Sequence, residues 1–364
     1  MWPDRRLIEL LNIEHPIIQA PMAGATDWEL AVEVAEAGGL GSIPCGMLTP
    51  ERLGEDAAKI RARTDKPINF NFLCHPPPKL DNAREAAWRD RLKGYYAEFG
   101  LAPNVPAPSI ARAPFDAAMC EALLALAPKI VSFHYGLPPP ALLKKLKAAG
   151  CVVIGCATTA AEARALEESG ADAVIAQGLD AGGHRGMFLA GDLASQVGTF
   201  ALVPQVADAV KVPVIAAGGI SDARGIAAAL ALGAAGVQIG SAFLLCPESK
   251  ISAPHRAALK AARDDATVLT NVITGRPARG IVNRVIREQG PISQDAPAFP
   301  LAANALAPLR AAAEKQGSGD FSPLWAGQAV ALGRELPARN LLQMLAAETQ
   351  ERLRRLTPAD ASTF

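Results

Sequence analysis

Short apolar runs alternate with amphipathic stretches along the first two thirds of the chain, which predicts strands followed by helices. Most of the runs contain almost no polar residue, as is typical of parallel strands that are covered on both faces. The helix predicted over 28–39 ends at Gly38-Gly39, a favoured helix stop. The eight predicted strands are 17–23, 39–44, 67–73, 129–136, 151–157, 171–178, 213–219 and 234–244.

This alternation is compatible with an eight-stranded barrel or with a doubly wound open sheet. The strand count of eight and a weak internal echo between 170–178 and 233–241 favour the barrel. We therefore predict an α/β protein, a (β/α)₈ TIM barrel with a smaller, mainly helical lid or substrate domain. The expected barrel comprises 1–75 and 107–250, and the expected lid, together with C-terminal helices, comprises 76–106 and 251–364.

Composition and charge narrow the range of partners. The 364 residues include 36 basic and 36 acidic side chains, so the formal net charge is zero, which argues against nucleic acid and anionic membranes. Six cysteines lie scattered without a C-x-x-C pair, so neither a disulfide framework nor a metal site is expected. No apolar run is long enough to span a membrane and the N-terminus is charged, so we expect a cytoplasmic protein.

Polar side chains and glycines gather at the ends of the predicted strands, where barrel enzymes carry their chemistry. Such groups are costly to bury unless a ligand or another residue satisfies them, so together they predict a polar ligand. The positions concerned are Ala20-Pro21-Met22, Asn71, His134, Gln177, Gly218-Gly219, Gln238, Gly240 and Ser241.

Two glycine-rich turns, Gly218-Gly219 and Gly240-Ser241, lie towards the carboxyl ends of the last two predicted strands. Glycine lets the backbone approach an anion closely, and many barrels hold a phosphate at these two loops. The other interpretation is that the glycines only form tight turns. The turns match neither the dinucleotide-binding fingerprint nor a P-loop, so a phosphate-bearing ligand is favoured and nucleotide binding of either of those types is not expected.

The segment 177–186 places His184 and Arg185 among four glycines directly after the sixth strand. A histidine there can exchange a proton near neutral pH or supply positive charge to an anion, so His184 is the candidate catalytic residue. His134 ends the fourth strand beside aromatic residues, and it either packs in the core or lines the substrate pocket. His15, His75 and His255 lie in ordinary contexts, and we expect no role for them.

Several of these motifs resemble nitronate monooxygenase, formerly called 2-nitropropane dioxygenase. The resemblance extends in order from about residue 7 to WAGQ at 325–328. It rests on APMAG at 20–24, NFNFLCH at 69–75, VSFHYG at 131–136, AQGLDAGGHRG at 176–186, AAGGI at 216–220 and VQIGSAFLLCPES at 237–249. It implies a TIM barrel with a lid, non-covalent FMN, and oxidation of alkyl nitronates such as propionate 3-nitronate by O₂ without NAD(P)H.

The resemblance also assigns roles to individual residues. It implies that His184 faces the reactive edge of the flavin and that His134 and His184 line the substrate site. The implied cofactor contacts are Ala20, Pro21, Met22, Asn71, Gln177, Gly182, Gly218 and Gly219 along the flavin, and Gln238, Gly240 and Ser241 near its phosphate. The chain departs from the family in the lid, where a tyrosine and a lysine are often found but Phe299 and Ala307 stand here. That departure concerns the substrate and not the flavin.

Two other functions stay open from the sequence. A flavin-dependent NAD(P)H reductase of quinones or enoyl thioesters would use a similar barrel. A non-redox barrel that binds a phosphate ligand would need the glycine turns but not the amide-and-histidine loop. The expected partners are therefore small molecules, and a homodimer stays open.

Overall fold

The computed structural model describes residues 2–102, 113–189 and 191–356. Within them, all eight predicted barrel strands form, and they pair in parallel in the order β1-β9-β8-β6-β5-β4-β3-β2. A bridge between Ile18 and Leu40 joins the two outer strands and closes the barrel. The prediction of a (β/α)₈ barrel is thus confirmed. The strands are β1 (Ile17–Gln19), β2 (Gly41–Pro44), β3 (Ile68–Leu73), β4 (Ile130–His134), β5 (Val152–Ala157), β6 (Ala173–Gln177), β8 (Val214–Ala217) and β9 (Gly236–Ile239).

The apolar character of the strands follows from burial on both faces. In β6, Ala173 and Ile175 belong to one apolar cluster, whereas Val174 and Ala176 belong to another. Successive side chains of a strand point to opposite faces, so one set fills the barrel interior and the other contacts the surrounding helices. Neither face reaches water, and both sets must be apolar.

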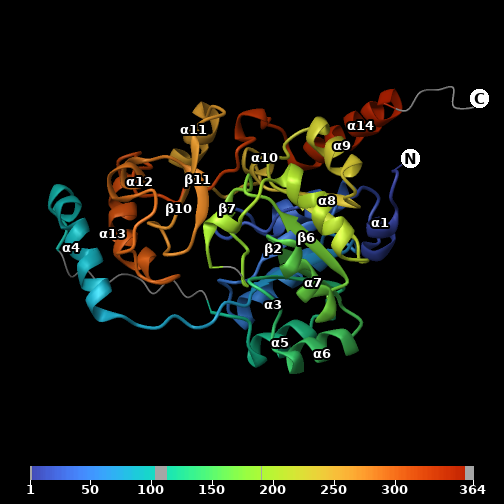
Figure 1. The fold of residues 1–364 in the computed structure, drawn as a ribbon, viewed down its shortest axis with the longest axis horizontal. Coiled ribbons are helices and arrows are strands. Elements are labelled where there is room, and N and C mark those ends of the chain that lie inside the picture. Colours follow the sequence, from blue (N-terminus) through green and yellow to red (C-terminus); the bar gives the residue numbers. More distant parts are fainter. Residues whose placement is uncertain (1, 103–112, 190, 357–364) are drawn as a thin grey trace, which may run out of the picture.

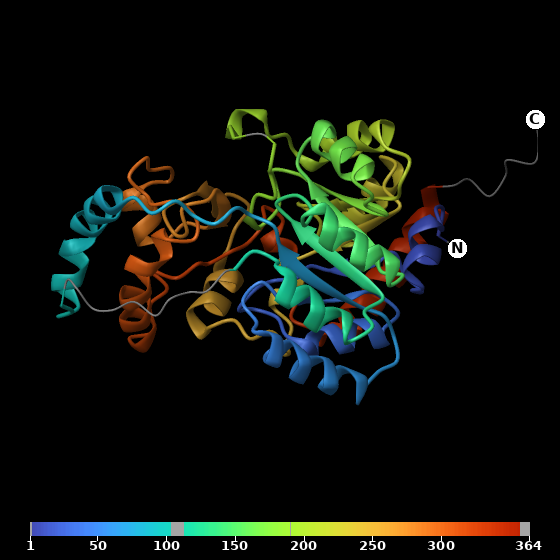
Figure 2. The same ribbon diagram turned by 90° about the horizontal axis from the view of Figure 1, so that it is seen from below.

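Helices surround the barrel on its outside (Figures 1 and 2). Several begin where a side chain caps the first turn, as Asp27, Thr49 and Thr159 do by accepting from backbone amides. The helices of the barrel layer are α1 (Arg6–Leu11), α2 (Trp28–Glu36), α3 (Pro50–Arg61), α5 (Ala117–Leu124), α6 (Pro140–Ala148), α7 (Ala160–Glu168), the 3₁₀ turn η1 (Leu193–Ser195), α8 (Thr199–Ala209), α9 (Ala223–Ala231) and α10 (Ser241–Leu244).

The prediction of one strand over 234–244 was too long. Strand β9 ends at Ile239, and α10 begins at Ser241. Both elements are largely buried, so the apolar run continues from the strand into the helix. The hydrophobic pattern therefore does not show where the strand ends.

The lid lies to one side of the barrel (Figures 1 and 2). Its own apolar core includes Trp88, Val272, Ile286, Leu309 and Phe321. It also contains an antiparallel sheet in the order β10-β11-β7. The elements are α4 (Asn82–Glu98), β7 (Gly183–His184), α11 (Ala253–Ala261), β10 (Thr267–Thr270), β11 (Ala278–Ile281), α12 (Arg284–Gln289), α13 (Ala302–Lys315) and the 3₁₀ turn η2 (Val330–Leu332).

The last helix, α14 (Ala338–Leu356), returns to the barrel and packs against α2 and α9. Its residues Leu341, Leu342 and Leu345 are buried in the same cluster as Ile17 and Val237 of the barrel. We therefore group α14 with the barrel, whereas the sequence analysis grouped it with the lid. The other domain bounds stay a proposal.

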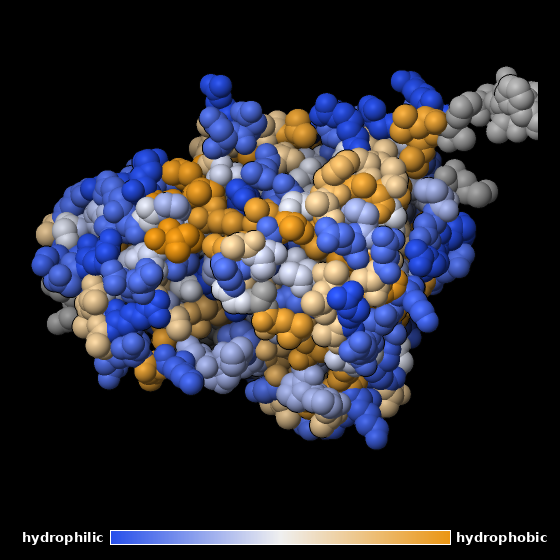
Figure 3. Space-filling view, viewed as in Figure 1, coloured by the Kyte–Doolittle hydropathy of each residue, from blue (hydrophilic) through white to orange (hydrophobic). Residues whose placement is uncertain are grey.

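The surface is mixed in character. On the face shown in Figure 3, hydrophilic side chains cover the outer end of the lid, and apolar areas lie between lid and barrel. No helix in the described part of the chain is long and apolar enough to cross a membrane.

Candidate active site

The segment that follows β6, residues 178–186, connects barrel and lid, and we call it the β6 loop. Its end forms β7, which pairs with β11 so that His184 lies opposite Ala278 and Gly183 opposite Arg279. His184 therefore lies where the lid sheet meets the carboxyl end of a barrel strand, which is the position of catalytic groups in barrels of this type.

The imidazole of His184 is held from several sides. Its Nε2 atom lies 2.8 Å from the hydroxyl of Thr274. The rings of Phe299 and Trp325 meet it edge-on, with ring centroids 5.2 and 5.3 Å away. Thr274, Phe299 and Trp325 all come from the region after residue 250, so the lid fixes the orientation of this side chain.

Gln177 braces the β6 loop with both ends of its side-chain amide. Its Oε1 accepts from the backbone amide of Gly186 at 2.7 Å, and its Nε2 donates to the carbonyl of His184 at 3.0 Å. Its contact with the flavin stays a prediction, whereas its hydrogen bonds explain why an amide is needed at the end of β6.

Arg185 is fully buried under the same loop. Its guanidinium donates to the carbonyls of Gln177 and Gly178 at 2.7 and 2.5 Å, and to Oε1 of Gln196 at 2.9 Å. Burial of the charge lowers the pKa of Arg185 to about 10. This arginine therefore holds the loop together from beneath, and its donors are used inside the protein.

A strap from the C-terminal part of the chain, residues 324–328, crosses the β6 loop. A Cβ atom on Gly182 would lie 2.5 Å from the backbone nitrogen of Gly327, so only glycine permits this approach. The amide of Gln328 donates to the carbonyl of Asp180 at 3.0 Å, and the amide of Gly327 donates to the hydroxyl of Ser241 at 2.8 Å. The strap thus links the β6 loop to the end of β9.

His134 ends β4 and belongs to a buried polar group. Its Nδ1 lies 3.0 Å from Nδ2 of Asn71, which also contacts the hydroxyl of Ser132 at 2.9 Å. Burial, with a smaller effect from the positive charge of Arg276, lowers the pKa of His134 to about 4. His134 is therefore a neutral group near pH 7.

Arg276 is a residue that the sequence analysis missed. Its guanidinium stacks on the ring of Tyr135, 3.9 Å from the ring centroid, and donates to the carbonyl of Met187. Burial lowers its pKa. It lies in the region after residue 250, where the sequence shows no strand-helix alternation, so only its neighbourhood in the fold identifies it.

Aromatic rings connect His184 with Tyr135, the residue that follows His134. The ring of Phe299 lies 5.8 Å from that of Tyr135, which follows His134, and 5.2 Å from that of His184. His75 also packs edge-on against Phe299, at 5.0 Å, so it belongs to this cluster, and its lack of a functional role stays a prediction. Ala307 lies on the lid helix α13.

The ends of β8 and β9 offer unpaired backbone donors. Among the described residues, the amides of Gly219, Gly240 and Ser241 make no hydrogen bond. Gly218 and Gly219 have φ values of 115° and 67°, which favour glycine. We call Gly218-Gly219 and Gly240-Ser241 the glycine cradle. Its partly exposed amides can bind an anion, which fits the phosphate of FMN.

Some of the residues predicted to contact the cofactor lie next to the glycine cradle. A Cβ atom on Gly240 would lie 3.7 Å from Cβ of Ala20 and from Sδ of Met22, so these residues adjoin the cradle. The side chain of Gln238 is almost buried and forms no hydrogen bond within the described part of the chain. Pro21 lies between Ala20 and Met22, and its role, like theirs, stays a prediction.

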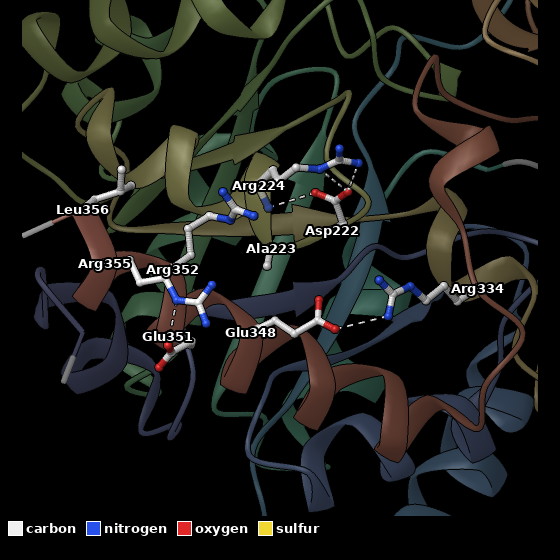
Figure 4. Close-up of a pocket in the computed structure, with 9 residues that line it drawn as sticks. All are labelled: Asp222, Ala223, Arg224, Arg334, Glu348, Glu351, Arg352, Arg355 and Leu356. Atoms are coloured by element: carbon white, nitrogen blue, oxygen red, sulfur yellow. Dashed lines mark hydrogen bonds and ion pairs between the residues drawn. The ribbon is translucent and has the colours of Figure 1, made fainter.

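A separate cavity of about 580 Å³ lies between the start of α9 and the end of α14 (Figure 4). Most of the charged residues that line it form ion pairs with one another: Arg224 with Asp222, Arg334 with Glu348, and Arg355 with Glu351. In the described residues, no group of three or more His, Cys, Asp or Glu side chains could hold a metal ion. The site at the strand ends is therefore the better candidate for chemistry.

A (β/α)₈ barrel with a lid, a histidine held between the two, and open backbone donors at β8 and β9 has the design of a barrel enzyme. The family described as nitronate monooxygenase matches residues 4–348. The nitronate monooxygenase of Pseudomonas aeruginosa is 46% identical over 345 residues, which cover 94% of this chain and 98% of that protein.

Solved structures agree with this match. Nitroalkane oxidase from Streptomyces ansochromogenes superposes with a TM-score of 0.88 at 39% identity, covering 97% of this chain and 100% of that one. FabK from Thermotoga maritima superposes with a TM-score of 0.74 at 30% identity, covering 98% and 99%. The chain belongs to the nitronate monooxygenase family of oxidoreductases, and the resemblance noted in its sequence is confirmed.

Proposed function

We propose that this protein uses FMN and O₂ to oxidise alkyl nitronates, such as propionate 3-nitronate, to a carbonyl product and nitrite. The family membership supports the reaction class. The observation that carries the proposal is the placement of His184, which Thr274 and two aromatic rings hold at the junction of lid and barrel.

The glycine cradle would hold the phosphate of FMN through the amides of Gly219, Gly240 and Ser241. Gln238 and the side-chain oxygen of Asn71, which has no hydrogen-bond partner among the described residues, would be available to the flavin ring. When bound, FMN would supply the redox chemistry that the side chains of this chain lack.

The role of His184 depends on the substrate form. A nitronate is an anion, and the imidazole would stabilise its charge by donating a hydrogen bond or a proton. With a neutral nitroalkane, the same imidazole would remove the α-proton as a general base. The buried Arg276 adds a fixed positive charge near the site.

A second candidate function, which the sequence left open, is a flavin-dependent NAD(P)H reductase of quinones or enoyl thioesters. A cytoplasmic location and a homodimer stay predictions from the sequence.

The experiment that separates the two functions starts from the purified protein with its bound cofactor. We expect a flavin spectrum, release of FMN rather than FAD on heating, bleaching by propionate 3-nitronate without O₂, and recovery of the spectrum when O₂ is admitted. NADH and NADPH should cause no bleaching under the same conditions. Rapid bleaching by NAD(P)H but not by nitronate would instead establish the reductase, and a colourless protein that cannot be loaded with FMN would refute both.

A further inference from the structure

The side-chain amide of Asn71 has only one possible orientation. Its Nδ2 atom lies 3.3 Å from the backbone carbonyl of Ser132 and 2.9 Å from the hydroxyl of the same residue. A carbonyl oxygen only accepts, so the atom facing it must be the NH₂ group. The two oxygens of Ser132 share one hydrogen of this NH₂ group, and the other hydrogen faces Nδ1 of His134, at 3.0 Å.

This geometry determines the tautomer of His134. Because the NH₂ group of Asn71 donates, Nδ1 of His134 must accept, and the proton of the neutral ring is then on Nε2. Nε2 forms no hydrogen bond with any described residue. It is also not one of the fully buried atoms without a partner, so it is accessible to a ligand. The ring therefore offers one N–H donor that the protein itself does not use.

That donor lies close to the other groups of the candidate site. Tyr135 follows His134 in the chain, and its ring contacts both Phe299 and the guanidinium of Arg276. Phe299 in turn contacts His184. After burial, the positive charge of Arg276 is the second cause of the lowered pKa of His134, so this guanidinium lies near His134 as well as on the ring of Tyr135.

We propose that Asn71 is a positioning residue which locks His134 in the Nε2–H tautomer, and that this N–H donates to an oxygen of the nitronate group. The proposal rests on the proposed function and deepens it by dividing the work between two histidines. His134 supplies a fixed, uncharged donor that binds the anion, and His184 supplies the proton exchange. Because the pKa of His134 is lowered to about 4, its ring stays a neutral N–H donor near pH 7.

The first test compares two replacements of His134. Glutamine can place an amide N–H near the position of Nε2, whereas leucine has a similar size and no donor. We expect His134→Leu to raise KM for propionate 3-nitronate by about 10- to 100-fold, the effect of one hydrogen bond to a charged group. His134→Gln should stay within about threefold of wild type, and both variants should retain FMN. Equal KM values in the two variants would overturn the substrate contact.

The second test reads the tautomer directly and needs no substrate. In the FMN-loaded enzyme labelled with ¹⁵N-histidine, the signals of His134 are those that disappear in His134→Gln. We expect a protonated Nε2 and an unprotonated Nδ1 at neutral pH. Asn71→Asp should move a proton to Nδ1, because a carboxylate only accepts. A wild-type His134 with its proton on Nδ1, or an imidazolium, would overturn the role of Asn71.

The two tests fail separately. An enzyme that binds FMN but oxidises no nitronate refutes the proposed function and, with it, the nitronate contact of His134. The tautomer measurement on the same protein still decides whether Asn71 positions this ring.

Discussion

The β6 loop and the glycine cradle are both rich in glycine, and both lie at the carboxyl ends of barrel strands, yet they differ in how their polar groups are satisfied. In the β6 loop, the side chains of Gln177 and Arg185 form hydrogen bonds with the backbone on both sides of His184. In the cradle, the amides of Gly219, Gly240 and Ser241 have no partner among the described residues. Glycine serves close packing in the first region and leaves donors open in the second.

The difference separates two kinds of functional region. A loop that buried side chains hold by hydrogen bonds keeps its shape without a ligand and can present one side chain precisely. A turn whose amides are unpaired gains its missing hydrogen bonds only when an acceptor arrives. We therefore expect changes in the β6 loop to affect stability and catalysis, and changes in the cradle to affect binding of the cofactor.

The largest effect is expected at the side chain that the β6 loop presents. His184→Asn removes the group that would take the α-proton, so kcat/KM for a neutral nitroalkane should fall by about 10²–10⁴-fold. Oxidation of the pre-formed nitronate should fall less, because no such proton transfer is needed. FMN content should stay unchanged, since the cradle is intact. Kinetics of wild type and variant with both substrate forms between pH 6 and 9 test this. If kcat/KM of the variant equals that of wild type for each form, His184 has no part in the mechanism.

A smaller effect is expected when the support beneath the loop is removed. Arg185→Met leaves the carbonyls of Gln177 and Gly178 without their donors in a buried place. The free energy of unfolding should fall by about 2–4 kcal/mol, since each unsatisfied buried group costs about 1–3 kcal/mol. Urea denaturation of the FMN-loaded protein measures this.

The control for that measurement is Arg224→Met. Arg224 pairs with Asp222 at the surface, where an ion pair contributes about 0–1 kcal/mol. If both variants lose the same stability, then the buried hydrogen bonds of Arg185 do not support the loop as we describe.

The smallest effect is expected from one amide of the cradle. Ser241 is the first residue of α10, where proline interrupts no hydrogen bond within the helix, so Ser241→Pro removes the open N–H group of the cradle. The dissociation constant of FMN should rise by about 10- to 100-fold, as expected for one hydrogen bond to a phosphate. Fluorescence titration of the apoprotein with FMN measures this constant.

The matched control is Ser241→Ala, which keeps the amide and removes the hydroxyl that accepts from Gly327. FMN should bind to this variant nearly as tightly as to wild type. If alanine weakens binding as much as proline does, the hydroxyl or the strap is responsible, and the open amide is not.

The sequence alone was sufficient to predict the eight barrel strands, and it nominated their carboxyl ends as the candidate site. Most strand positions are buried on both faces, so most strands appear as largely apolar runs, and polar residues such as His134 and Gln177 mark the ends of two of them. The motif around His184 further indicated the family, which the comparisons confirmed.

Only the tertiary structure decided which groups meet. Thr274 is 90 residues from His184 in the chain, and Arg276 is 89 residues from Met187, and both come from a region without a regular pattern. The packing of α14 on the barrel was equally hidden, because the apolar face of a helix shows that it is buried but not against what. Periodicity reports whether a side chain leaves water, whereas its hydrogen-bond partner, its tautomer and its role depend on contacts between distant segments.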